Sequence, residues 1–240
     1  MMKIITVASA KGGVGKSTFC CSAGKMLAHN GQRVLLVDMD IGVRSLDILL
    51  GVAEKTVYNW GDVIKGNCEY RKAVTEISNG LFLMAAPIDF SEEYSVEGFK
   101  AMLSSLEKDF DYALLDAPAG LESGFRLCGG VSDCCVVMST PDPISIRAAT
   151  YAAQNMRDMG IKSIRLVINK FNKKLHKGIN VDEFIDTVGA RFLGVIPESE
   201  EIYRFVNGEK IPYKSKGNQA FLRISQRLEG KNVPFRVKNL

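Results

Sequence analysis

A glycine-rich run follows the first apolar stretch of the chain almost at once. Residues Ile4 to Ala8 read as a short buried strand, and the next residues are Ala10-Lys11-Gly12-Gly13-Val14-Gly15-Lys16-Ser17-Thr18. A helical pattern begins near Lys16. In a strand–turn–helix unit of this kind, backbone N–H groups and the positive end of the helix converge on an anion, and glycines let it approach because they lack a Cβ. The run therefore predicts a P-loop that binds nucleotide phosphates.

The polar residues of this loop have separate expected roles. Lys16 is expected to place its charge on the β- and γ-phosphates, and the Ser17 hydroxyl is expected to be a ligand of Mg²⁺. The general pattern opens with glycine where this chain has Ala10, and a residue as small as alanine still permits the turn. The residues expected to contact the nucleotide here are Lys11, Gly12, Gly13, Val14, Gly15, Lys16, Ser17 and Thr18.

Two later strands are followed by carboxylates. The stretch Arg33 to Val37 ends in Asp38-Met39-Asp40, and the stretch Tyr112 to Leu115 delivers Asp116, followed by Ala-Pro-Ala-Gly. Carboxyl ends of parallel strands lie at one edge of a sheet, where carboxylates can hold Mg²⁺ or orient an attacking water. An isolated Asp-x-Asp is more often a solvated strand end or a helix cap. The P-loop upstream favours the metal and water site.

Strand patterns alternate with helical patterns along the whole chain, which predicts a doubly wound α/β fold with a mostly parallel sheet. The strands are rich in Val, Ile and Leu, as expected when both faces of a sheet are covered. With 240 residues, 46% of them hydrophobic, and no linker or repeat, residues 1–240 are expected to form a single domain. The expected strands are Lys3–Ala8, Val34–Val37, Leu81–Ala85, Tyr112–Leu115, Cys134–Ser139, Ile164–Ile168 and Phe192–Ile196, and the expected helices include Lys16–Asn30, Val96–Asp109, Ser145–Met159 and Asp182–Val188.

Lys11 is a second lysine that an ordinary P-loop does not need. The string Lys-Gly-Gly-Val-Gly-Lys-Ser-Thr resembles the deviant Walker A motif of the MinD/ParA family of ATPases. The stretches Ile41 to Gly51, Gly194 to Glu198 and Arg227 to Gly230 are similar to the MinD branch of that family, so the resemblance covers nearly the whole chain. It implies the fold of a P-loop NTPase of the deviant Walker A class. It also implies an ATP hydrolase that is a monomer with ADP and a homodimer with ATP.

The resemblance assigns roles to particular residues. It implies that Lys11 reaches the phosphates bound by the partner protomer and that Asp40 helps to activate water. Lys11, Lys16 and Asp40 are therefore the expected catalytic residues. Asp38 is expected near the metal, and Asp116 resembles the Walker B aspartate. The expected metal site consists of Ser17, Asp38 and Asp116, with ATP and Mg²⁺ as the ligands of the whole site.

The base is expected at the carboxyl ends of the last two strands. Asn169 follows the stretch Arg165 to Ile168 and matches the adenine-binding position of the family, where its amide can pair with the ring edge. The alternative is a strand-end residue that bonds to its own backbone. The loop containing Pro197 and Glu198 resembles another base-contacting loop of the family.

The cysteines raise the alternative of a metal cluster, since iron–sulfur proteins share this P-loop class. Cys128-Gly129-Gly130 resembles a cluster-binding position, but residues 84–100 hold no companion cysteine and the chain has no Cys-x-x-Cys. The six cysteines are expected to be buried small side chains rather than ligands or disulfides.

The charge is uneven along the chain. Residues 1–120 carry 12 basic and 15 acidic side chains, and residues 121–240 carry 19 and 12. This distribution suits an anionic membrane surface or nucleic acid, and scattered solvated lysines are the alternative. The basic residues are Lys170, Lys173, Lys174, His176 and Lys177 in one loop, and Lys214, Lys216, Arg223, Arg227, Lys231, Arg236 and Lys238 toward the C-terminus.

Three functions are compatible with the resemblance. MinD proteins bind membrane through a C-terminal amphipathic helix and recruit a division inhibitor, and a protein regulator triggers hydrolysis and release. Only five residues follow Phe235 here, so such a helix is not expected. The first function is a MinD-type switch in the placement of the division site or a related cellular structure. The alternatives are a ParA-like partition ATPase that binds DNA non-specifically and a non-catalytic nucleotide-gated scaffold. We expect a cytoplasmic location, with peripheral contact at the inner face of the membrane under the first function.

Overall fold

The computed structural model describes residues 1–176, 180–206 and 214–235. The strands are β1 (Lys3–Ala8), β2 (Val34–Asp38), β3 (Val74–Ser78), β4 (Leu81–Met84), β5 (Tyr112–Asp116), β6 (Cys134–Ser139), β7 (Ser163–Phe171) and β8 (Arg191–Pro197). The helices are α1 (Lys16–His29), α2 (Ser45–Leu49), the 3-10 turn η1 (Ala53–Lys55), α3 (Trp60–Ile64), α4 (Tyr70–Ala73), α5 (Val96–Ser105), α6 (Ser123–Val131), α7 (Pro143–Asp158), α8 (Val181–Val188), α9 (Glu200–Val206) and α10 (Lys216–Leu228).

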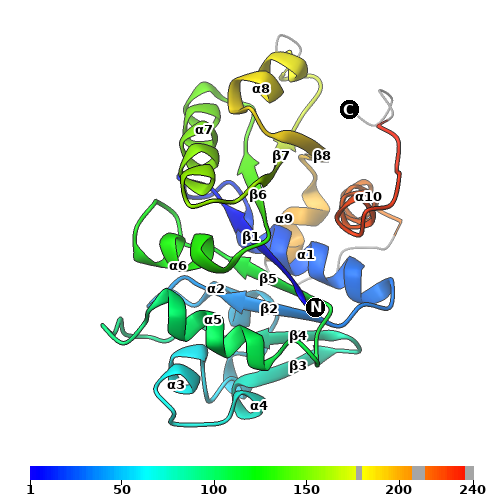
Figure 1. Cartoon of the computed structure of the whole chain (residues 1–240). Coiled ribbons are helices and arrows are strands. Elements are labelled where there is room, and N and C mark those ends of the chain that lie inside the picture. Colours follow the sequence, from blue (N-terminus) through cyan, green and yellow to red (C-terminus); the bar gives the residue numbers. More distant parts are fainter. Residues whose placement is uncertain (177–179, 207–213, 236–240) are drawn as a thin grey trace.

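The described strands form one twisted sheet in the order β3-β4-β2-β5-β1-β6-β7-β8 (Figure 1). Every neighbouring pair is parallel except β3 and β4, which are antiparallel. The predicted doubly wound α/β fold with a mostly parallel sheet is confirmed. The P-loop strand β1 lies near the middle of this order, between β5 and β6. Strand β5 carries Asp116, and β2, which carries Asp38, lies on the other side of β5.

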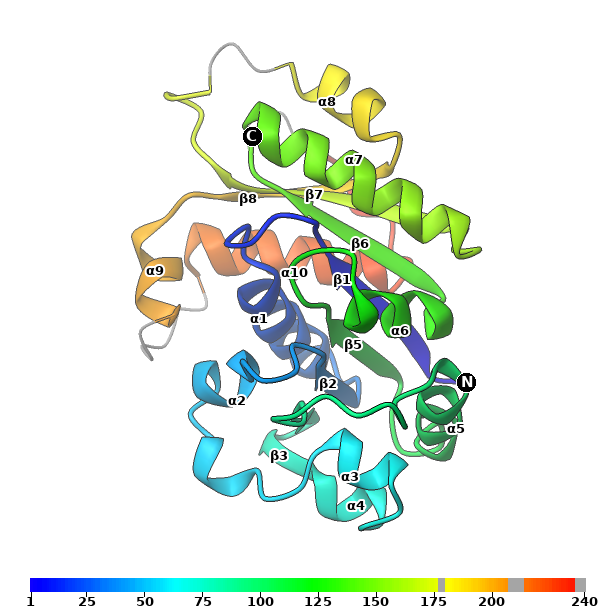
Figure 2. The same ribbon diagram turned by 90° about the vertical axis from the view of Figure 1, so that its left-hand side faces the viewer.

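Helices cover both faces of the sheet. Figure 2 shows α5, α6 and α7 in front of the strands, whereas α1 and α10 lie on the opposite face. Phe99 and Phe125 belong to the core on the first face, and Phe19 and Phe221 pack together on the second with ring centroids 6.2 Å apart. The strands are therefore buried on both sides, which explains their continuous apolar character.

Several element boundaries differ from those expected from the sequence. The strand expected over Ile164–Ile168 extends to Phe171, so Asn169 lies inside β7 rather than after it. The helix expected to begin at Ser145 begins at Pro143, because the Asp142 carboxylate caps it by accepting a hydrogen bond from the Ser145 N–H. The helix expected over Val96–Asp109 ends at Ser105. Strand β3 was not expected at all.

All six cysteines are free, and among the described residues no group of three or more His, Cys, Asp or Glu side chains could hold a metal ion. Five of the six are buried, in agreement with their expected role as small core side chains. Adjacent Cys134 and Cys135 belong to the cores on opposite faces, as neighbours on a strand must.

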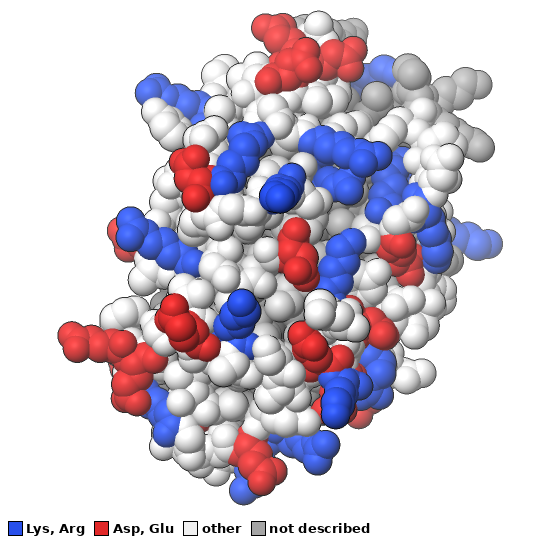
Figure 3. Space-filling model, viewed as in Figure 1, with Lys and Arg blue, Asp and Glu red and all other residues white. Residues whose placement is uncertain are grey.

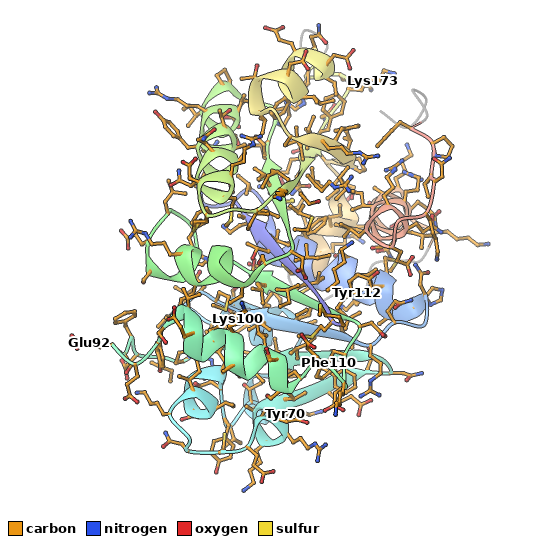
Figure 4. The ribbon with its side chains drawn as sticks, in the orientation of Figure 1. Tyr70, Glu92, Lys100, Phe110, Tyr112 and Lys173 are labelled. Carbon is orange, nitrogen blue, oxygen red and sulfur yellow. The ribbon has the colours of Figure 1, made fainter. Side chains whose placement is uncertain are left out.

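The two ends of the sheet are far apart. Tyr70, next to β3, and Lys173, in the segment that follows β7, lie at opposite ends of the molecule (Figure 4). The nucleotide-related residues gather between them, at the carboxyl ends of β1, β2, β5, β7 and β8.

Candidate nucleotide-binding site

The P-loop links β1 to α1 in a conformation that only glycine adopts readily. Gly13 and Gly15 have φ angles of 73° and 97°. Gly15 is also the N-cap of α1 and supplies no side-chain acceptor, so the first N–H groups of this helix are not capped by a side chain. Lys16, the first helical residue, is only 9% exposed. Free N–H groups and a buried ammonium at one helix start form a strong site for an oxyanion.

A cavity of about 580 Å³ opens beside this loop. The P-loop wall is formed by Gly13, Gly15, Lys16, Ser17 and Thr18, and the other walls by Val43, Ser45, Ile48, Leu49, Asn169, Lys170, Pro197, Glu198, Ser199, Ile202 and Tyr203. Three predicted contact residues of the P-loop do not line it, namely Lys11, Gly12 and Val14, and Val14 is buried. The predicted residues Asp38, Asp40 and Asp116 do not line it either. The size and the mixed polar and apolar walls are typical of a nucleotide pocket.

Asp38 and Asp116 lie side by side in the sheet, as register partners on β2 and β5. Burial raises the pKa of Asp116 to about 7, although a hydrogen bond with Ser17 opposes the change. Burial likewise raises the pKa of Asp38 to about 6. Two carboxylates and a hydroxyl are hard oxygen ligands, and a nearby cation favours the charged form of two adjacent buried acids. The residues present therefore fit Mg²⁺.

Asp38 has a second task that the sequence did not reveal. Its Oδ1 accepts the N–H of Asp40 at 2.9 Å and its Oδ2 accepts the N–H of Leu46 at 2.9 Å. Its carbonyl accepts the indole N–H of fully buried Trp60 at 2.8 Å. The carboxylate thus holds the loop that carries Asp40 against the end of β2.

Asp40 is partly exposed beside the P-loop. Burial raises its pKa, and the charge of Lys16 opposes the change, which places the two side chains in one electrostatic environment. A partly exposed carboxylate at this edge has access to both water and the anion-binding helix start. This placement is compatible with the predicted handling of water.

Lys11 does not point into the cavity of its own chain. Its Nζ donates to both carboxylate oxygens of Asp142 at 3.1 Å, and the two side chains are 34% and 39% exposed. Partial burial raises the pKa of Asp142, but hydrogen bonds from Thr140, from the Ser145 N–H and from Lys11 hold it below its usual range. Asp142 was not among the predicted residues, because a partner 131 residues away in sequence leaves no local signal.

Asn169 uses its amide in a way that the sequence did not predict. Its Nδ2 donates to the carbonyl of Val14 at 2.7 Å, and the Nζ of neighbouring Lys170 donates to the carbonyl of Gly13 at 2.9 Å. A Cβ on Gly15 would lie 2.3 Å from this Nδ2. The end of β7 therefore holds the P-loop through two of its carbonyls. The Oδ1 of the Asn169 amide can accept a hydrogen bond from a ligand.

The base-side walls come partly from expected and partly from unexpected residues. Pro197 ends β8 and Glu198 follows it, and both line the cavity as predicted loop residues should. Ile48 and Tyr203 are 69% and 52% exposed, and they line the same cavity from α2 and α9. Exposed apolar side chains at a cavity mouth are the usual lining of a base site. In the sequence, the apolar pair Ile202-Tyr203 lies between charged residues shortly after the Pro197-Glu198 loop. This pattern could have indicated a second wall for the base.

Comparisons with known proteins agree with this geometry. Residues 5–213 match the family described as the CobQ/CobB/MinD/ParA nucleotide binding domain. The chain is 32% identical over 245 residues to the septum site-determining protein MinD of Synechocystis sp., covering 98% of this chain and 92% of that protein.

Solved structures of MinD proteins are similar over the whole chain. The MinC:MinD cell division protein complex of Aquifex aeolicus contains a chain with a TM-score of 0.89 and 30% identity, with 98% of each chain covered. The MinD of Pyrococcus horikoshii, complexed with Mg-ADP, has a TM-score of 0.85 at 23% identity, covering 95% of this chain and 96% of that one, which shows the shared fold. The chain therefore belongs to the MinD/ParA family of nucleotide-binding proteins and, within it, to the group of MinD septum site-determining proteins.

Proposed function

We propose that this protein is a Mg-ATP-dependent ATPase of a single domain, which dimerises with ATP and acts as a switch in placing the division site. The observation that carries the proposal is the combination of a P-loop cavity, a pair of buried aspartates of which Asp116 interacts with Ser17 of the cavity wall, and a signature lysine held outside that cavity. A lysine at the rim of its own site is available to a second protomer. The relative of known structure that is bound to Mg-ADP supports the same ligands here.

The phosphates would be bound by Lys16 and the N–H groups at the start of α1. Ser17, Asp38 and Asp116 would hold Mg²⁺, which would supply positive charge to neutralise the bound phosphates. Phosphoryl transfer needs little covalent help from a protein, so positioning and charge account for the catalysis. Asp40 would orient the attacking water, and Lys11 of the partner protomer would add charge at the γ-phosphate.

We infer that the base is adenine. Because the Asn169 Nδ2 is engaged by Val14, its Oδ1 is the atom that can face the base, and Glu198 adds a carboxylate to the same cavity. Such an acceptor can bind the exocyclic amine of adenine. Guanine also carries an exocyclic amine, so the comparison of ATP with GTP tests the choice of base. The contacts of Pro197 and Glu198 with the ring remain part of this proposal.

The test measures nucleotide binding, hydrolysis and mass together. Wild-type protein is expected to bind ADP and ATP with Mg²⁺, to prefer ATP over GTP, and to be dimeric by light scattering with ATP but not with ADP. Asp40→Ala is expected to bind ATP, fail to hydrolyse it, and remain a dimer. Lys11→Ala is expected to bind ADP as the wild type does and not to dimerise. A protein that hydrolyses ATP as a monomer would contradict the dimer part.

A protein regulator that stimulates hydrolysis and a peripheral membrane contact belong to the same proposal. The solved relative is a complex with MinC, a division protein. Among the described residues, no helix combines the length and the apolar character that crossing a bilayer demands. Vesicle co-sedimentation in Mg-ATP and in Mg-ADP tests the proposed peripheral binding at the inner face of the membrane.

DNA binding, as in ParA-like proteins, is the second candidate. Arg165 and Arg191 are register partners on β7 and β8, and among the described ion pairs neither has a carboxylate partner. Like charges side by side on a sheet are unfavourable unless an anion joins them. On the face shown in Figure 3, however, Asp and Glu are interspersed with Lys and Arg, so no continuous basic stripe crosses it. Of the predicted basic residues, Lys177, Arg236 and Lys238 lie outside the described part of the chain. A salt-dependent shift of plasmid DNA with ATP would favour this candidate.

A further inference from the structure

The hydroxyl of Ser45 is attached to the hydroxyl of Ser17. Ser45 Oγ donates to Ser17 Oγ at 3.2 Å, across a sequence separation of 28 residues. Ser17 is also hydrogen-bonded to Asp116, the carboxylate at the end of β5. A hydroxyl has one proton and two lone pairs. With the proton directed to Asp116 and one lone pair occupied by Ser45, the direction of the remaining lone pair of Ser17 is fixed.

The backbone before Ser45 is held in an unusual conformation. Arg44 has a φ of 51°, a left-handed region that side chains with a Cβ rarely adopt. Its guanidinium donates to Asp47 Oδ2 at 2.7 Å and to Thr56 Oγ1 at 2.8 Å, and both of those residues are buried. Such conformations persist only where the surroundings enforce them, and they cluster at functional sites. Here the enforced turn directs the Ser45 side chain toward the P-loop.

The residue after Ser45 is fastened to the metal site. The N–H of Leu46 donates to Asp38 Oδ2 at 2.9 Å, and Leu46 itself is fully buried. Ser45 therefore lies between two anchors, the Arg44 network on one side and the Asp38 carboxylate on the other. It also lines the cavity next to Lys16 and Ser17.

We propose that Ser45 is a positioning residue that sets the orientation of the Ser17 hydroxyl for the divalent cation bound with the nucleotide. The proposal rests on the proposed function, since it concerns the same site. It differs from that function in assigning a role to a residue on α2, outside the P-loop and outside both aspartate strands. Groups that orient a metal ligand typically contribute about 10- to 100-fold to metal affinity. Because Ser45 is neutral and only partly buried, we expect the lower end, about tenfold.

A purely structural role predicts a different result. If Ser45 served only to start α2, removing its hydroxyl would lower the stability of the fold and leave the dependence on Mg²⁺ unchanged. If it orients Ser17, removal would shift the dependence on Mg²⁺ and leave the binding of metal-free nucleotide unchanged. The two roles are separated by titration of the metal rather than by activity.

The experiment is calorimetric titration of ADP into the full chain, with EDTA and at a series of Mg²⁺ concentrations. Ser45→Ala is expected to bind ADP as the wild type does in EDTA and to need about ten times more Mg²⁺ for the metal-enhanced affinity. Ser45→Thr, which keeps the hydroxyl, is expected to restore the wild-type dependence. Ser104→Ala, which removes an exposed serine hydroxyl on α5, is the matched control and is expected to change nothing.

Three results would overturn the inference or its basis. Equal Mg²⁺ dependence of Ser45→Ala and wild type removes the role of Ser45, and so does a Ser45→Thr variant as weak as Ser45→Ala. Failure of the wild type itself to bind ADP with Mg²⁺ overturns the proposed function and this inference with it. Should Ser45→Ala not fold by circular dichroism, Ser45→Cys keeps the shape with a much weaker donor, and the same comparison applies.

Discussion

The ion pair between Lys11 and Asp142 gives a quantitative prediction about dimerisation. If Lys11 serves the partner protomer, it must first leave Asp142, so the pair stabilises the monomer. Asp142→Asn is the chosen change because asparagine caps a helix as well as aspartate does and can keep the hydrogen bond from the Ser145 N–H. The charge is removed while the start of α7 is retained.

The size of the effect follows from the exposure of the pair. Both side chains are more than a third exposed. Ion pairs of this kind contribute about 0.2–1 kcal/mol to stability. Each protomer of a symmetric dimer releases one lysine, so the total is about 0.4–2 kcal/mol, which corresponds to a roughly 2- to 30-fold larger association constant for Asp142→Asn. Salt should reduce the difference, because the pair is screened.

Sedimentation equilibrium with Mg-ATP measures this constant directly. Both proteins carry Asp40→Ala so that the nucleotide is not consumed, and each is studied at low and at high salt. Asp142→Ala is the control for the helix cap, since it removes the charge and the cap and should lower the unfolding free energy by about 1 kcal/mol. An Asp142→Asn protein that dimerises no more tightly than its parent, or more weakly, would refute the argument that Lys11 is held back by this pair.

Three further predictions follow from the site. Lys16→Ala should weaken ADP and ATP binding by at least tenfold, because a buried charge on phosphate is lost, and calorimetry on a variant with unchanged circular dichroism checks it. Gly15→Ala should abolish nucleotide binding and lower the melting temperature by several degrees. The new Cβ would collide with Asn169, and the alanine would have to adopt a left-handed backbone conformation. A fully stable variant would contradict this prediction. In metal-free protein, the free energy of unfolding should fall as the pH rises from about 4 through 7. Burial raises the pKa of Asp38 to about 6 and of Asp116 to about 7. Over this pH range the native state therefore holds protons that the unfolded state has released. Calorimetric scans from pH 5 to 8 measure this trend, which Asp116→Asn should flatten and which a rising melting temperature would disprove.

The parts of the site that depend on local sequence could be predicted. The glycines at positions 13 and 15 predict a turn with positive φ angles, which both residues have. The helical pattern that begins near Lys16 predicts the helix that starts there. The adjacency of Asp38 and Asp116 also follows from sequence, because parallel strands bring their carboxyl ends to one edge. The alternation of strand and helix patterns along the chain was sufficient to predict the fold class.

The parts that depend on contacts between distant segments could not be predicted. Strand β3 has no strong apolar run, and it exists because it pairs with β4 at the edge of the sheet. Strand β7 extends past its expected end and includes Asn169, whose amide donates to the Val14 carbonyl. No residue of β7 taken alone indicates this extension or this contact. The role of Lys170 at the Gly13 carbonyl was missed since a lysine after a strand is usually solvated.

The packing of α10 on α1 has a consequence for synthesis of the protein. The Ser225 hydroxyl donates to the carbonyl of Ala23, and Phe221 packs on Phe19, so the helix that follows the P-loop is covered by almost the last described element of the chain. At about 5–20 residues per second, a ribosome needs roughly 10–45 seconds to pass from the P-loop to Leu228. During that interval the P-loop is already made while one side of its helix is still open to solvent. A nascent chain would thus acquire the full cover of the helix behind its nucleotide pocket only after α10 has been made and has packed on α1.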